Sequence, residues 1–192
     1  MEQIKKDAVI LLHEIYGVNE FIEKKKRELE LLGFDVYVPN LLERPAFSYE
    51  QKEVAYDFFM NRVGFDKDKQ VLYLTTKLKR HYNKVIVIGF SVGATIAYKC
   101  SESDLVDGVI CCYGSRIRDY ADINPQCPTL VILSNDDTEV ILNQIKEKSN
   151  IEILLFDSKH GFIDEYSTAY NEIDSNLAMK AIVTFIENKI LK

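Results

Sequence analysis

Hydrophobic residues in this chain gather into short continuous runs, and segments with helical periodicity separate those runs. Continuous apolar runs are typical of parallel strands that are covered on both faces. We therefore expect strands at residues 8–12, 35–39, 84–89, 108–113, 129–134 and 151–156. The periodic segments predict helices at roughly 19–32, 66–81, 91–101, 139–148 and 172–191. Alternating strands and helices indicate an α/β fold, with a doubly wound, mostly parallel sheet of about six strands and right-handed crossovers.

The spacing of these elements predicts one domain over residues 1–192, a length that suits a single core. Gly33 follows the first predicted helix at the position where a glycine commonly ends one. Residues 41–65 interrupt the alternation and are rich in aromatic side chains, and we expect a helix there at roughly 49–61. These aromatic residues, Phe59 among them, could equally roof a substrate pocket or pack the helix onto the sheet.

Composition narrows the classes of function. The longest apolar runs span about five residues, far short of the roughly 20 needed to cross a bilayer. The net charge is −6 and the basic clusters are short, which argues against a nucleic-acid partner. The acidic N-terminal residues lack the apolar core of a secretory signal. We therefore expect a cytoplasmic protein with neither a nucleic-acid nor a membrane partner.

The cysteines support the same compartment. Cys100, Cys111, Cys112 and Cys127 have spacings that fit no zinc-binding pattern. Cys111 and Cys112 are adjacent in a predicted strand, so their side chains should point to opposite faces of the sheet. Buried free thiols in a reducing cytoplasm are the expected state.

The most specific motif is Gly89-Phe90-Ser91-Val92-Gly93, directly behind the apolar run 85–88. It has the G-x-S-x-G pattern of a nucleophile elbow, in which a strand turns sharply into a helix and exposes the serine oxygen. A Cβ at either glycine should clash with the neighbouring strand and helix. The serine would lie beside the free N–H groups at a helix N-terminus. The motif predicts nucleophilic catalysis by Ser91.

A serine nucleophile needs a base and an acid that orients the base. Asp136 and Asp137 follow the strand expected at 129–134, and His160 follows the strand expected at 151–156. The order serine, aspartate, histidine is the one expected on this kind of sheet, where strand ends bring the three together. By pattern alone, either aspartate could face the histidine, and the other would cap the next helix.

An oxyanion hole needs two preorganised N–H donors. The residue after the nucleophile, Val92, supplies one, and the loop 13–17 should supply the other, with Ile15 as the expected donor and Glu14 as the alternative. A zinc site is an alternative interpretation of three residues, His13, Glu14 and His160. The chain has three histidines and no H-x-x-x-H pair, so we expect no metal site.

Taken together, these motifs resemble the dienelactone hydrolase family of α/β-hydrolases along nearly the whole chain. The matching segments are 13–19, 32–41, 89–93, 112–114, 134–137 and 160–162. The resemblance implies an α/β-hydrolase fold, a catalytic triad and hydrolysis of an ester or lactone without a cofactor. It favours Asp137 as the triad acid. The candidate substrate-binding residues are Glu14, Tyr16, Lys52, Phe59 and Tyr113.

The chain departs from that family in three ways. Ser91 stands where dienelactone hydrolases carry cysteine, which puts the family role of Glu14, control of the thiol, in doubt. Lys52 and Asp164 stand where the family holds a substrate carboxylate with two arginines, so Asp164 should disfavour an anionic substrate. The family's leading strands before Ala8 are missing, so the sheet should be shorter at one edge.

The sequence therefore predicts a serine hydrolase that cleaves a small ester, lactone or thioester and acts as a monomer or homodimer. Two alternatives use the same scaffold. One is a non-catalytic protein that binds a small ligand, which the intact triad argues against. The other is an acyltransferase, which would prefer an alcohol or amine over water as the acceptor.

Overall fold

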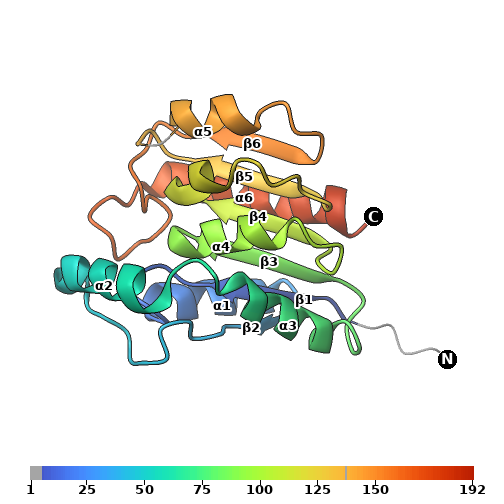
Figure 1. The fold of residues 1–192 in the computed structure, drawn as a ribbon, viewed down its shortest axis with the longest axis horizontal. Coiled ribbons are helices and arrows are strands. Elements are labelled where there is room, and N and C mark those ends of the chain that lie inside the picture. The colour runs from blue at the N-terminus through green and yellow to red at the C-terminus, as the bar shows by residue number, and fades with distance from the viewer. Residues whose placement is uncertain (1–5, 137) are drawn as a thin grey trace.

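The computed structural model describes residues 6–136 and 138–192 of the chain. Within them, six parallel strands form one sheet in the order β2-β1-β3-β4-β5-β6 (Figure 1). These strands are β1 (Ala8–Leu12), β2 (Asp35–Tyr37), β3 (Val85–Phe90), β4 (Gly108–Cys112), β5 (Thr129–Leu133) and β6 (Ile151–Leu155). The strand order reverses between β1 and β3, and the crevice beyond the carboxyl ends of such strands is where α/β sheets place their sites.

Helices cover both faces of the sheet. On one face α1 (Glu20–Leu31) and α6 (Glu172–Phe185) pack, and on the other α3 (Asp68–Leu78), α4 (Val92–Cys100) and α5 (Thr138–Ile145), as Figure 1 shows. The 3₁₀ and π segments are η1 (Tyr49–Gln51), η2 (Phe59–Val63), η3 (Ser115–Tyr120) and η4 (Ile186–Ile190), and the helix α2 (Lys52–Phe58) lies between η1 and η2. The predicted doubly wound α/β fold is confirmed.

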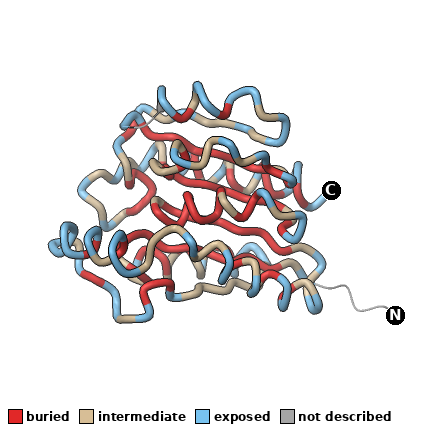
Figure 2. The backbone as a smooth tube through the Cα atoms, viewed as in Figure 1, coloured by how far each residue is buried: buried red, intermediate tan, exposed pale blue. Residues whose placement is uncertain are grey.

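The core lies along the central strands. Every residue of β1, β3, β4 and β5 is buried, whereas the edge strands β2 and β6 are partly exposed (Figure 2). Continuous apolar sequence therefore marks strands that are covered on both faces. Cys111 packs into one hydrophobic cluster and Cys112 into the other, as their alternation predicts. All four cysteines are buried and free.

The predicted elements match the observed ones closely, with differences at their ends. The first helix starts with Asn19, whose side chain accepts a hydrogen bond from the backbone N–H of Ile22, and Gly33 follows it at φ 99°. The last helix is regular only to Phe185 and continues as the π segment η4. The segment η3 was not predicted, because it contains one buried apolar residue, Ile117, and shows no helical periodicity.

None of the helices formed by residues 6–136 and 138–192 is both long enough and apolar enough to cross a membrane.

Candidate active site

Ser91 occupies a strained turn between β3 and α4. Its backbone has φ 54° and ψ −115°, in the left-handed half of conformational space that non-glycine residues rarely adopt. A Cβ added at Gly89 would lie 2.1 Å from the carbonyl oxygen of Gly93, and one added at Gly93 would lie 2.6 Å from that of His13. Both contacts are shorter than atoms tolerate. The glycines are therefore required by close packing of the turn against α4 and the end of β1.

The serine meets a histidine across the carboxyl edge of the sheet. His160 Nε2 lies 2.9 Å from Ser91 Oγ, which is hydrogen-bonding distance for a base and its nucleophile. The backbone N–H of His160 donates to Oδ2 of Asp136 at 2.8 Å, which holds the histidine loop beside the end of β5. The backbone N–H of Ser91 donates to the Cys112 carbonyl at 2.9 Å. The structure thus brings together the predicted nucleophile and base.

The predicted acid of the triad is residue 137, which separates the two described segments. Asp137 lies outside the described residues, so its role stays a prediction. Asp136 is exposed, and the bond to the backbone of His160 occupies one of its carboxylate oxygens. The pattern assigned Asp136 either to the imidazole or to a helix cap. Anchoring the histidine backbone is a third role, which depends on the approach of two loops.

The ring of Tyr113 packs against the ring of His160. Tyr113 follows β4 at φ 44°, it is 1% exposed, and its ring centroid lies 5.0 Å from that of His160 in an edge-on arrangement. The ring also packs against Phe162, at 5.8 Å between centroids. Tyr113 is absent from the residues that line the cavity described below. The substrate contact predicted for its side chain is therefore replaced by packing beneath the base.

The loop after β1 is held by a buried histidine. His13 Nδ1 donates to the carbonyl oxygen of Glu14 at 2.7 Å, and the backbone N–H of Leu41 donates to His13 Nε2 at 2.9 Å. Burial lowers the pKa of His13 to about 4, so the ring is neutral near pH 7. Because both ring nitrogens are engaged within the protein, His13 shapes the loop. Among the described residues, no group of three histidine, cysteine, aspartate or glutamate side chains could hold a metal ion.

Ser91 and His160 open onto a cavity of about 320 Å³. Both expected oxyanion donors, Val92 and Ile15, line it. The other lining residues are Glu14, Tyr16, Tyr49, Lys52, Tyr56, Met60, Phe65, Ser115, Arg116, Arg118, Gly161, Asp164 and Ser167. This cavity therefore collects the predicted nucleophile, base and oxyanion loop with three of the candidate substrate-binding residues, Glu14, Tyr16 and Lys52.

The aromatic insert divides between the cavity and the core. Tyr49, Tyr56 and Phe65 line the cavity, so the insert does form part of its wall. Phe59 has no exposed surface and stacks edge-on against Phe65, with 5.2 Å between centroids. The predicted contact of Phe59 with substrate is therefore wrong, because the helical turn carrying Phe59 points it into the core.

Two buried acids lie at one side of the cavity. Glu14 is 6% exposed, and burial, helped by the negative charge of Asp164, raises its pKa to about 8. Asp164 has no exposed surface, and its pKa is also raised by burial. Its Oδ2 accepts a hydrogen bond from the Tyr49 hydroxyl at 2.5 Å, and its Oδ1 accepts one from the backbone N–H of Tyr166 at 2.9 Å. The contact with Tyr49 joins residues 115 positions apart, and no local pattern reveals it.

Basic side chains also line the cavity, and sequence reasoning missed two of them. Lys52 was predicted, but Arg116 and Arg118 come from the unpredicted segment η3. Arg116 Nη2 donates to the Tyr56 hydroxyl at 3.1 Å, which joins η3 to the aromatic insert. The sequence did hold one signal for the two arginines, because they follow a central strand, and residues after such strands commonly contribute to sites in α/β sheets. With Asp164 engaged by Tyr49 and three basic residues on the wall, Asp164 alone does not exclude an anionic substrate.

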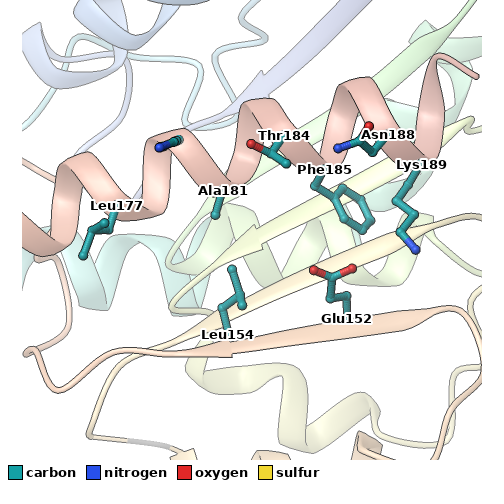
Figure 3. Close-up of a pocket in the computed structure, with 9 residues that line it drawn as sticks. Glu152, Leu154, Leu177, Ala181, Thr184, Phe185, Asn188 and Lys189 are labelled. Carbon is teal, nitrogen blue, oxygen red and sulfur yellow. The ribbon is translucent and has the colours of Figure 1, made fainter.

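A second hollow, of about 370 Å³, lies between β6 and α6 (Figure 3). Its lining combines the apolar side chains of Leu154, Leu177 and Phe185 with the charged side chains of Glu152 and Lys189. Neither Ser91 nor His160 is among the residues that line it. The nucleophile and base predicted from the sequence lie at the cavity at the carboxyl edge of the sheet and not at this hollow.

Comparisons with known proteins address the family and the fold of the chain. The sequence model described as the dienelactone hydrolase family matches residues 1–190. "Uncharacterized protein YczH" of Bacillus subtilis (strain 168) is 38% identical over 175 residues, covering 86% of this chain and 85% of that protein. The structure of a dienelactone hydrolase-like promiscuous phosphotriesterase from metagenomic libraries has a TM-score of 0.76 at 16% identity, covering 97% of this chain and 88% of the other. For the dienelactone hydrolase of Anabaena variabilis ATCC 29413 the TM-score is 0.64 at 17% identity, with coverages of 98% and 88%.

Proposed function

This chain belongs to the dienelactone hydrolase family, and from that membership we propose that it is a serine hydrolase cleaving a small ester, lactone or thioester. The proposal rests chiefly on one observation. The oxygen of Ser91, on a strained turn, lies 2.9 Å from Nε2 of His160 at the wall of a cavity. Family membership and fold support a hydrolase, and this pair supports the finer assignment of a serine nucleophile and an acyl substrate.

The proposed reaction runs through an acyl-enzyme. His160 takes the proton from Ser91 as the serine oxygen bonds to the substrate carbonyl carbon. The backbone N–H groups of Val92 and Ile15 stabilise the oxyanion. His160 then gives the proton to the leaving alcohol or thiol as its bond to carbon breaks. Water, deprotonated by His160, releases the acid and restores Ser91. Asp137 is the proposed partner that orients the imidazole and stabilises its charged form.

The dimensions of the site favour a small substrate. A cavity of about 320 Å³ lies at the lower end of the range found for small-molecule sites. Tyr56 and Arg116 bridge the insert and η3 at this cavity, which limits its width. Compact esters, lactones and thioesters fit such a space better than long acyl chains do.

A serine-reactive phosphonate tests the nucleophile. We expect the wild-type protein to be labelled at Ser91 and Ser91→Ala to remain unlabelled. Ser115→Ala is the matched control, because Ser115 lines the same cavity and has no predicted role in the bond-making step. Equal labelling of wild type and Ser91→Ala would show that the nucleophile is another residue.

Turnover separates the proposal from its alternatives. We expect short-chain nitrophenyl esters to be hydrolysed by wild type and by Ser115→Ala, with the rate of Ser91→Ala lower by at least about 10³-fold. A ligand-binding protein would bind esters without turnover. An acyltransferase would form a new ester or amide in preference to the free acid when an alcohol or amine is added.

A further inference from the structure

Glu14 is a buried carboxyl group on the cavity wall, and one of its two oxygens has no close hydrogen bond within the described residues. The residue is 6% exposed, and this oxygen is Oε1. The buried hydroxyl of Tyr113 interacts with this carboxyl group, and it too makes no close hydrogen bond within the described residues. Buried polar groups in native proteins are almost always satisfied, so such a carboxyl oxygen at a cavity wall is a place where a ligand can form the missing bond.

The surroundings of Glu14 favour its neutral form. Burial and, to a smaller extent, the negative charge of Asp164 raise its pKa to about 8, and a hydrogen bond with the Tyr113 hydroxyl opposes the shift. Near pH 7 the carboxyl therefore carries a proton, and a protonated carboxyl can both donate and accept a hydrogen bond. The titratable groups that interact with it are Asp164, Tyr113, Tyr16, Tyr49 and Cys112, and the charged or titratable groups elsewhere on the cavity wall are Lys52, Arg116, Arg118 and His160.

The neighbouring acid, Asp164, has less hydrogen-bonding capacity left for a ligand. Both oxygens of Asp164 already accept hydrogen bonds, from the Tyr49 hydroxyl and the backbone N–H of Tyr166. Its net effect on Glu14 is to place negative charge close by. Of the two acids on this side of the cavity, Glu14 is therefore the one whose carboxyl group still has hydrogen-bonding capacity for a substrate.

The charged residues around Glu14 determine which kind of substrate group its carboxyl can bind. A carboxylate placed against Glu14 would lie beside Asp164 and be repelled. An ammonium group would share the cavity with Lys52 and two arginines. A neutral hydroxyl group avoids both penalties, and it matches the donor and acceptor of a protonated carboxyl.

We propose that the Glu14 side chain binds a hydroxyl group on the acyl part of the substrate, so that the preferred substrates are hydroxyacyl esters or thioesters. This inference rests on the proposed hydrolase function and deepens it. A site that hydrogen-bonds a substrate hydroxyl rejects the analogue that lacks it, because the buried polar group is then left unpaired. Glu14 would thus determine specificity for the acyl group, while Ser91 and His160 carry out the reaction.

Isosteric ester pairs test the proposal. Ethyl 2-hydroxypropanoate is compared with ethyl 2-methylpropanoate, and ethyl 3-hydroxybutanoate with ethyl 3-methylbutanoate, by pH-stat titration. The members of each pair differ by a methyl group in place of the hydroxyl. The preference is the kcat/KM for the hydroxy ester divided by that for its isostere, and for at least one pair we expect it to be about tenfold greater with the Glu14 side chain than without a hydrogen-bonding group at position 14, the effect of one hydrogen bond to a buried group.

Two variants at position 14 separate hydrogen bonding from a general structural effect. Glu14→Gln keeps a neutral donor and acceptor of the same shape, so it should retain the preference. Glu14→Leu has neither, and its preference should be about tenfold lower than that of wild type. Because each preference is a ratio measured on one protein sample, the fraction of folded protein cancels. The wild-type preference should decline as pH rises through about 8, whereas that of Glu14→Gln should not change with pH.

The outcomes distinguish this inference from the function on which it rests. If wild type and Glu14→Leu show the same preference for both pairs, the hydrolase assignment stands and the hydroxyl subsite is refuted. Loss of the preference in Glu14→Gln also refutes the subsite. Failure to hydrolyse any of the four esters, or the same rates in Ser91→Ala, overturns the hydrolase proposal and the subsite together.

Discussion

The adjacent residues His13 and Glu14 should make stability depend on pH in opposite directions. Burial lowers the pKa of His13 from 6.5 to about 4 and raises that of Glu14 from 4.5 to about 8. Between pH 4 and 6.5 the unfolded chain binds a proton at His13 that the folded protein does not, so stability rises with pH. Between pH 4.5 and 8 the folded protein keeps a proton at Glu14 that the unfolded chain loses, so stability falls.

The magnitudes follow from these shifts. Each group changes the free energy of unfolding by about 1.4 kcal/mol per pH unit inside its window. From pH 4.5 to 6.5 the two slopes cancel, and above pH 6.5 only that of Glu14 remains, lowering wild-type stability by about 2 kcal/mol up to pH 8. Glu14→Gln removes the second slope. Its stability relative to wild type should therefore increase by about 5 kcal/mol between pH 4.5 and 8.

Urea unfolding at a series of pH values measures this difference. Circular dichroism is the suitable probe, because the chain contains no tryptophan. The difference between the variant and wild type cancels the titration of every group that both proteins share. Parallel stability curves for wild type and Glu14→Gln from pH 4.5 to 8 would refute the argument, since they would mean that Glu14 titrates normally in the folded protein.

Three other substitutions test the architecture of the site. Gly93→Ala should lower the free energy of unfolding by about 3 kcal/mol in urea denaturation, because its Cβ would lie 2.6 Å from a carbonyl oxygen; a loss below about 1 kcal/mol would show that the turn can relax. Tyr49→Phe removes the 2.5 Å bond to Asp164 and should lower thermal stability by about 1–3 kcal/mol; an unchanged melting temperature would contradict this bond. Asp136→Ala frees the backbone of His160 and should lower kcat on nitrophenyl esters about tenfold, whereas Asp136→Asn, which keeps an acceptor, should lose less.

Elements with local signals could be predicted from the sequence. Helices cover both faces of the strands β1, β3, β4 and β5, and these strands are therefore continuous apolar runs. Their burial can be predicted from the residues alone. The turn at Ser91 was predictable because its two glycines are required by contacts within a few residues and with the adjacent strand.

Other features of the site had no local signal. The segment η3 lacks periodicity, so Arg116 and Arg118 were missed, although they line the cavity. Within the aromatic insert, the choice between cavity and core depends on the direction of each side chain in an irregular helix. Phe59 was therefore assigned wrongly, while Tyr49 was not foreseen as the partner of Asp164.

By itself, the sequence determined the parallel α/β architecture and the order in which serine, aspartate and histidine follow their strands. Apolar runs, glycine positions and chain order are properties of neighbouring residues, and they are read without coordinates. Only the tertiary structure decided that His160 reaches Ser91 and that Glu14 lies buried at the cavity wall, where burial and Asp164 raise its pKa. These properties depend on distance and on exclusion of water among residues far apart in the chain, which only the packed fold creates.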